Sequence, residues 1–188
     1  MTGLFFGSFN PIHKGHLQIA RYLLDDQLVD RVLFVVSPQN PFKKEESLLN
    51  AEKRIEIATK AVAGNARMGI SDIELSMPRP SYTVDTLRRF SILCPGERFA
   101  LIMGEDNLKN FPLWKGYEII RRDYPVFVYP RNGSSMQPAG DSRIHFIKAP
   151  LFPVSSTEIR EKIARGEDIL PFVPEKVHDL ILTYYQTT

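Results

Sequence analysis

Short apolar runs alternate with helical patterns along this chain of 188 residues, and no other feature restricts its fold as strongly. Runs rich in β-branched and aromatic residues predict strands at residues 4–6, 32–36, 99–103, 126–129 and 144–147, with a weaker run at 68–73. Apolar stripes predict helices around Leu17, Ala20, Leu23 and Leu24 and around Ile55, Ala58, Ala61 and Val62, and further helices are expected at 84–93, 117–122, 156–165 and 174–185. Strands this apolar need cover on both faces, so the pattern predicts an α/β fold with a doubly wound parallel sheet and C-terminal helices.

The composition limits the class of protein. With 43% hydrophobic residues the chain is long enough for one well-buried core, and we expect a single domain over residues 1–188. A formal net charge of +2 is too small to indicate a nucleic-acid partner. Cys94 is the single cysteine, so no internal disulfide can form, and we expect its thiol to be buried and unreactive. No apolar run approaches the ~20 residues that span a bilayer, so we expect a cytoplasmic protein without a membrane partner.

Three segments directly follow predicted strands, at residues 7–16, 37–44 and 104–106. Parallel sheets bind their ligands beyond the carboxyl ends of the strands. We therefore expect these three segments to lie together around one site.

The first of these segments, GSFNPIHKGH, is built for close approach to an anion. Gly7 and Gly15 let the backbone come near a bulky ligand, and Pro11 stiffens the turn between them. A helix that begins near residue 14 points its free amides into the same space. His13 and His16 lie about one helical turn apart, so both imidazoles can reach one pocket. A metal pair is the alternative, and phosphate binding is favoured because the turn has no Cys, Asp or Glu to complete a metal site.

A second anion site is predicted in VSSTEIREKIARG, far along the chain. Ser155 and Glu158 form a capping box that begins a helix, and Gly166 ends it. A well-capped surface helix would explain these residues alone. It does not explain the further hydroxyls of Ser156 and Thr157 at the helix N-terminus or the cation Arg160 one turn later. Together these three residues indicate a site for an anion.

Both segments resemble motifs of the nucleotidylyltransferase superfamily. GSFNPIHKGH is similar to the (H/T)xGH signature, whose histidines contact the phosphates of a nucleoside triphosphate, and VSSTEIR resembles the (I/V)SSTxxR motif, which holds the β- and γ-phosphates. Asn10 stands where many members carry aspartate. The resemblance implies a Rossmann-like nucleotide-binding fold.

The middle of the chain resembles bacterial nicotinate mononucleotide adenylyltransferases. RPSYTVDTL is similar to their GPSYTxDTL segment, in which the backbone around the second threonine, here Thr86, binds the nicotinate carboxylate. IMGEDNLKNFPLW resembles IIGADxLxxLPxW, which implies that Asp106 binds a ribose hydroxyl and that Trp114 packs on the pyridine ring. The alternatives from the residues alone are a helix start capped by Ser81 or Thr83 and a tryptophan that belongs to the core.

The loop after the second predicted strand departs from the family. PFKK stands where many members have PPHK, so Lys44 keeps the lysine and Lys43 replaces the histidine. A cation for phosphate therefore remains, although a charged run of this kind is also typical of a solvated loop. The sequence does not decide which lysine reaches the substrate.

The resemblance implies an enzyme of NAD biosynthesis that joins the AMP of ATP to nicotinate mononucleotide and releases pyrophosphate. Nicotinamide mononucleotide or phosphopantetheine as acceptor, or a nucleotide-binding module without turnover, are the alternatives. The implied catalytic residues are His13, His16, Lys44 and Arg160. The implied ATP-binding residues are Gly7, Ser8, Phe9, His13, His16, Gly104, Asp106, Ser156, Thr157 and Arg160. The implied acceptor-binding residues are Ser8, Phe9, Lys43, Lys44, Tyr82, Thr83, Thr86, Asp106 and Trp114. Mg²⁺ is expected to arrive with ATP rather than in a metal site of the protein, and homo-oligomerisation is left open.

Overall fold

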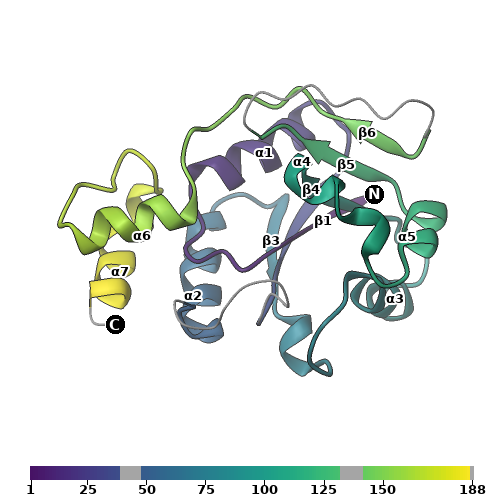
Figure 1. Ribbon diagram of the computed structural model, residues 1–188, viewed down its shortest axis with the longest axis horizontal. Coiled ribbons are helices and arrows are strands. Elements are labelled where there is room, and N and C mark those ends of the chain that lie inside the picture. Colours follow the sequence, from purple (N-terminus) through teal and green to yellow (C-terminus); the bar gives the residue numbers. More distant parts are fainter. Residues whose placement is uncertain (39–47, 132–141, 187–188) are drawn as a thin grey trace.

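The computed structural model describes residues 1–38, 48–131 and 142–186, and within them six strands form one parallel sheet (Figure 1). The strands are β1 (Thr2–Gly7), β2 (Arg31–Val36), β3 (Met68–Ser71), β4 (Phe99–Gly104), β5 (Val126–Tyr129) and β6 (Ile144–Phe146). Their order is β3-β2-β1-β4-β5-β6, and every neighbouring pair is parallel. The predicted doubly wound parallel sheet is therefore confirmed.

Helices cover both faces of the sheet. The α-helices in the described residues are α1 (Lys14–Asp25), α2 (Ala51–Val62), α3 (Thr83–Leu93), α4 (Glu105–Leu108), α5 (Tyr117–Asp123), α6 (Ser156–Ala164) and α7 (Glu175–Gln186). The same residues contain the short 3₁₀ helices η2 (Ile73–Ser76) and η3 (Phe111–Leu113). Successive strand residues point to opposite faces, so Leu4 and Leu101 join an apolar cluster with α3 and α5, whereas Phe5 and Ile102 join the cluster with α1 and α2. This burial on both faces explains why the strands are apolar at nearly every position.

The strand order turns back at the centre of the sheet, between β1 and β4. The register places Gly7 beside Val36 and Gly104 beside Tyr129, so the strands end nearly level with one another. A crevice therefore opens beyond these strand ends, at the switch point where open α/β sheets bind ligands.

The C-terminal helices lie far from the strand that precedes them. Figure 1 shows β6 at one edge of the sheet, while α6 and α7 lie on the other side of the molecule, where α7 packs against α2. Residues 147–155 make this crossing past α1, where the ring of Phe152 lies beside that of His13. The crossing brings the second predicted anion segment back to the first.

Some expectations were wrong in detail. The weak strand at 68–73 ends at Ser71, and the chain then forms η2, because Asp72 interrupts the apolar run. Cys94 is exposed rather than buried, since it ends α3 in a surface turn before β4. No helix in the described part of the chain is long and apolar enough to cross a membrane.

A substitution inside the core tests the packing of α2 on the sheet. Ile57 has none of its surface exposed, so Ile57→Ala should lower the free energy of unfolding by about 2–5 kcal/mol in urea denaturation. Ile92 on α3 is 70% exposed, and Ile92→Ala should change it by less than about 0.5 kcal/mol. Equal effects of the two substitutions would contradict the assigned burial.

Candidate active site

The loop between β1 and α1 brings two histidine rings together. Phe9 adopts a positive φ of 45° and buries its ring against Phe5 and Phe34. A side chain at position 7 would meet the Phe9 ring at 2.9 Å, so only glycine fits there. Packing against Phe9, whose ring centroid lies 5.1 Å away, also fixes the ring of His16. The turn is thus held by aromatic packing as well as by its glycines.

His13 and His16 are held in defined roles at the start of α1. The backbone N–H of His13 donates to Nδ1 of His16 at 3.3 Å, so a neutral His16 carries its proton on Nε2. The two rings lie 3.7 Å apart. Burial lowers the pKa of His13 to about 3, with a smaller contribution from the charge of Arg131. His13 is therefore neutral at pH 7 and offers a hydrogen bond rather than a positive charge.

Helix α6 docks on the same loop. Its capping box is confirmed: the N–H of Glu158 donates to Oγ of Ser155 at 3.2 Å, and the N–H of Ser155 donates to the Glu158 carboxylate at 2.6 Å. Oγ of Ser156 donates to the carbonyl of Pro11 at 2.9 Å. Nη1 of Arg160 donates to the carbonyl of Asn10 at 2.8 Å. The two predicted anion segments are therefore joined by direct hydrogen bonds.

The ends of β4 and β5 add a charged pair. Oδ2 of Asp106 lies 3.6 Å from Nη1 of Arg131, and the guanidinium of Arg131 lies 5.8 Å from the centroid of the Tyr129 ring. Burial raises the pKa of Tyr129, so its hydroxyl stays protonated. The sequence analysis missed Arg131 and Tyr129. The rule that selected the other strand-end segments would have found them, because both lie where β5 ends.

The turn before α3 forms a different wall around a buried carboxylate. Glu74, which the sequence analysis also missed, accepts hydrogen bonds from Oγ of Ser81 at 2.9 Å and from Oγ1 of Thr86 at 2.8 Å. Trp114 stands at the same wall with its ring edge-on to Phe111, at a centroid distance of 5.4 Å.

The structure places Thr86 away from the cavity wall. Its side chain is fully buried one turn into α3, and it does not line the cavity. Its backbone N–H is also engaged, donating to the carbonyl of Tyr82 at 3.1 Å. The amides of Thr83 and Val84 open the helix and have no intrahelical acceptor. An anion at this helix end would meet those two amides, not that of Thr86.

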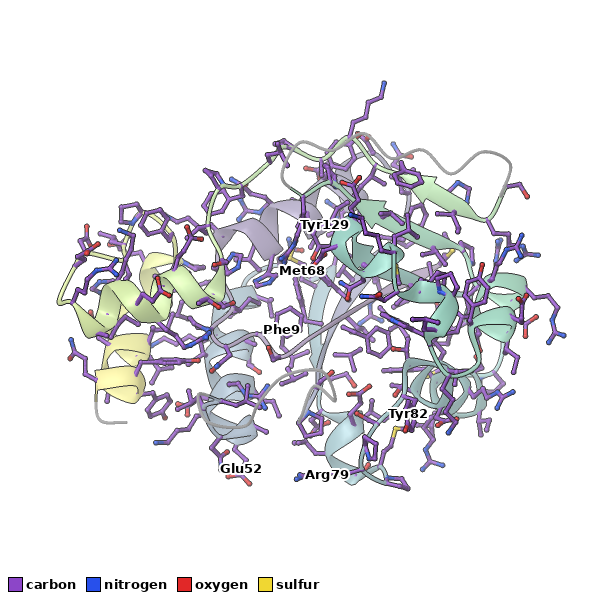
Figure 2. All side chains as sticks on the ribbon, in the orientation of Figure 1. Phe9, Glu52, Met68, Arg79, Tyr82 and Tyr129 are labelled. Carbon is purple, nitrogen blue, oxygen red and sulfur yellow. The ribbon has the colours of Figure 1, made fainter. Side chains whose placement is uncertain are left out.

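These walls enclose a cavity of about 770 Å³, within the size range of small-molecule sites. The sequence-predicted residues in its wall are Gly7, Ser8, Phe9, His13, His16, Tyr82, Thr83, Gly104, Asp106, Trp114, Ser156, Thr157 and Arg160. Figure 2 labels three lining residues, Phe9, Tyr82 and Tyr129, which come from the β1 loop, the turn before α3 and the end of β5. Lys43 and Lys44 lie outside the described residues. His16 and Thr157, distant in sequence, thus share one cavity.

The cavity combines donors for phosphate with an aromatic wall. In the part of the chain that the structure describes, no group of three or more His, Cys, Asp or Glu side chains could hold a metal ion. The hydrogen-bond donors that line the cavity suit an anionic group of a ligand, and its aromatic wall suits a flat ring.

Comparison with known proteins agrees with this geometry. The Cytidylyltransferase-like family model matches residues 4–162. A probable nicotinate-nucleotide adenylyltransferase of Cytophaga hutchinsonii is 46% identical over 97% of this chain and 97% of its own length. A protein of the same name from Flavobacterium psychrophilum is 43% identical, over 93% of this chain and 92% of its own length.

Solved structures show the same fold at lower sequence identity. The Plasmodium falciparum nicotinic acid mononucleotide adenylyltransferase in complex with NaAD superposes with a TM-score of 0.82 at 17% identity, covering 100% of this chain and 98% of that one. At this sequence identity the structural similarity establishes the fold alone, whereas the bacterial relatives establish the family. This chain belongs to the nicotinate-nucleotide adenylyltransferase family of the cytidylyltransferase-like proteins.

Proposed function

We propose that this protein transfers the AMP moiety of ATP to nicotinate mononucleotide, forming nicotinate adenine dinucleotide and pyrophosphate in NAD biosynthesis. The observation that carries the proposal is the shared cavity, in which the histidines of α1 and the N-terminus of α6 face the aromatic wall of Tyr82 and Trp114. Two relatives of this chain carry the name of this activity, and the Plasmodium falciparum enzyme was solved with NaAD and with APC. We also infer that the enzyme works in the cytoplasm.

The reaction needs alignment more than acid–base chemistry. A phosphate oxygen of the acceptor attacks the α-phosphorus of ATP in line, the bond from that phosphorus to the bridging oxygen breaks, and pyrophosphate leaves. No general base is required, because the attacking phosphate is already ionised. Two like unit charges 4 Å apart repel by about 4 kcal/mol at an effective dielectric constant of 20, so the site must offset this repulsion.

Four groups at the ATP side supply that compensation. Arg160 provides a full positive charge, and Nε2–H of His16 provides a donor at the start of α1. Neutral His13 adds a hydrogen bond without adding charge. Thr157 adds a hydroxyl at the N-terminus of α6, where the helix amides favour an anion. Lys43 and Lys44 remain predicted phosphate contacts.

The acceptor side holds the pyridine and the ribose. The indole of Trp114 offers a flat apolar face for stacking on the pyridine ring. The first amides of α3, at Thr83 and Val84, would receive the nicotinate carboxylate. Asp106 would accept a hydrogen bond from a ribose hydroxyl.

Mg²⁺ enters this proposal as part of the substrate. The oxygens of the triphosphate would themselves supply ligands for the ion, as is usual for Mg²⁺ at nucleotide sites. When bound there, Mg²⁺ neutralises charge on the departing pyrophosphate.

A direct assay tests the proposal. The purified protein, mixed with ATP and Mg²⁺, should release pyrophosphate with nicotinate mononucleotide at least about tenfold faster than with nicotinamide mononucleotide or phosphopantetheine, because a helix N-terminus favours the carboxylate over a neutral group. Faster turnover with either other acceptor would replace the proposed substrate. Binding of ATP without pyrophosphate release from any acceptor would contradict an enzymatic role.

Removal of the His16 imidazole tests the phosphate site. His16→Ala should lower kcat at least about a hundredfold, since a donor to the reacting phosphates stabilises the transition state. The matched control is His145→Ala, which removes an exposed histidine on β6 and should leave kcat unchanged. Turnover of His16→Ala close to that of the parent protein would exclude the assigned role.

Substitution of Trp114 tests the acceptor site. Trp114→Ala should raise KM for nicotinate mononucleotide at least about tenfold while KM for ATP changes less than about twofold, because only the pyridine ring loses its stacking partner. Steady-state kinetics with each substrate varied in turn would measure both constants. An equal rise in the two would indicate that Trp114 serves the core alone.

A further inference from the structure

Arg54 lies buried beneath the cavity and bonds to backbone carbonyls on three sides. Only 1% of its surface is exposed. Nε donates to the carbonyl of Leu49 at 2.7 Å, Nη1 to the carbonyls of Ser8 and Ser37, the latter at 2.9 Å, and Nη2 to the carbonyl of Pro38 at 3.2 Å. The acceptors thus come from the loop after β1, from the loop after β2 and from the residue before the N-cap of α2.

The hydrogen bonds of Arg54 within the described residues all go to neutral backbone carbonyls. No ion pair of Arg54 occurs among residues 1–38, 48–131 and 142–186. Burial lowers its pKa to about 10, so the guanidinium still carries its charge at neutral pH. A buried charge is costly to desolvate, and apolar residues of similar volume often stabilise a core better. The planar fork, by contrast, fixes several acceptors in one geometry.

The acceptors of Arg54 belong to residues at the cavity. Ser8 and Ser37 both line it, at the ends of the neighbouring strands β1 and β2. A single guanidinium nitrogen, Nη1, donates hydrogen bonds to both of their carbonyls. Arg54 therefore joins the loop after β1 to the loop after β2, although it does not itself line the cavity.

Asn10 provides a second tie at the same place. Its Oδ1 accepts hydrogen bonds from the N–H of Leu49 at 3.2 Å and from the hydroxyl of Tyr185 at 2.6 Å. Burial raises the pKa of Tyr185, which keeps that hydroxyl a donor. The β1 loop is thereby joined both to the residue that Arg54 holds and to the last turn of α7.

We propose that Arg54 is a positioning residue for the transfer reaction: its guanidinium holds the loop after β1 against the loop after β2, and so aligns the groups that contact the reacting phosphates. The inference rests on the proposed function, since it concerns the same site. Misplacement of reacting groups by about 1 Å can cost a hundredfold in rate. Loss of the hydrogen bonds from Arg54 should therefore lower kcat more than it weakens substrate binding.

Two substitutions of Arg54 distinguish the effect of its hydrogen bonds from the effects of its charge and of its side-chain volume. Arg54→Met keeps much of the volume and removes the donors, whereas Arg54→Lys keeps the charge and loses the fork. We expect kcat, expressed per molecule that binds ATP in equilibrium dialysis, to fall at least about thirtyfold in Arg54→Met and at least about tenfold in Arg54→Lys. KM for ATP and for nicotinate mononucleotide should each change less than about threefold.

The controls use the same helix and the same network. Ile57→Val destabilises α2 by about 0.5–1.5 kcal/mol without touching either loop and should leave kcat per binding-competent molecule unchanged. Tyr185→Phe removes one hydrogen bond from Asn10 and should lower kcat about threefold or more. If Arg54→Met does not fold, Arg54→Lys and Tyr185→Phe decide the question.

The outcomes are distinct for the two proposals. A kcat within about twofold of the parent protein in both Arg54→Lys and Tyr185→Phe would overturn the positioning role and leave the proposed function intact. A fall in kcat that Ile57→Val reproduces would also overturn it, by showing a plain loss of stability. Absence of turnover by the parent protein with every acceptor would overturn the proposed function and this inference together.

Discussion

The docking of α6 on the loop after β1 makes one site out of two distant segments. Without it, the histidines of α1 and the N-terminus of α6 would be separate, weak anion sites. Two hydrogen bonds, from Ser156 to the carbonyl of Pro11 and from Arg160 to the carbonyl of Asn10, hold these segments face to face. They are available only because the chain crosses from β6, at one edge of the sheet, to the other side of the molecule after completing the sheet. The two segments can therefore form one phosphate site only because the topology of the sheet brings them together.

The electrostatics of the site are less positive than its residue types suggest. His13 is neutral because it is buried, and Arg131 faces the carboxylate of Asp106. Buried Glu74 adds a carboxylate beside the acceptor wall, held by Ser81 and Thr86. Much of the attraction for phosphate must then come from oriented dipoles, namely the ring Nε2–H of His16 and the N-termini of α1 and α6. Such dipoles are fixed before the substrate arrives and need no reorganisation during the reaction.

The sequence predicted the order of the elements well, because strands buried on both faces and well-capped helices leave clear local patterns. Most of the site residues that it predicted line the cavity, since strand ends and motif resemblance select them independently. The sequence could not show where tertiary packing would place each side chain. Thr86 looks like a ligand-binding residue in a linear motif, yet helical geometry turns it into the core and engages its amide. Arg54 gives no sign of its role in sequence, because its acceptors are backbone carbonyls, and every residue has one.

Backbone carbonyls of the β1 loop accept hydrogen bonds from two arginines. Arg160 donates to the carbonyl of Asn10 from the cavity side, and Arg54 donates to the carbonyl of Ser8 from beneath. An arginine paired with a carboxylate would lose much of its attraction for phosphate, because the two charges nearly cancel. Neutral acceptors fix the guanidinium in place and do not themselves cancel its charge. The loop is thus held by two arginines that donate to its carbonyls, and these hydrogen bonds position the loop without neutralising either guanidinium.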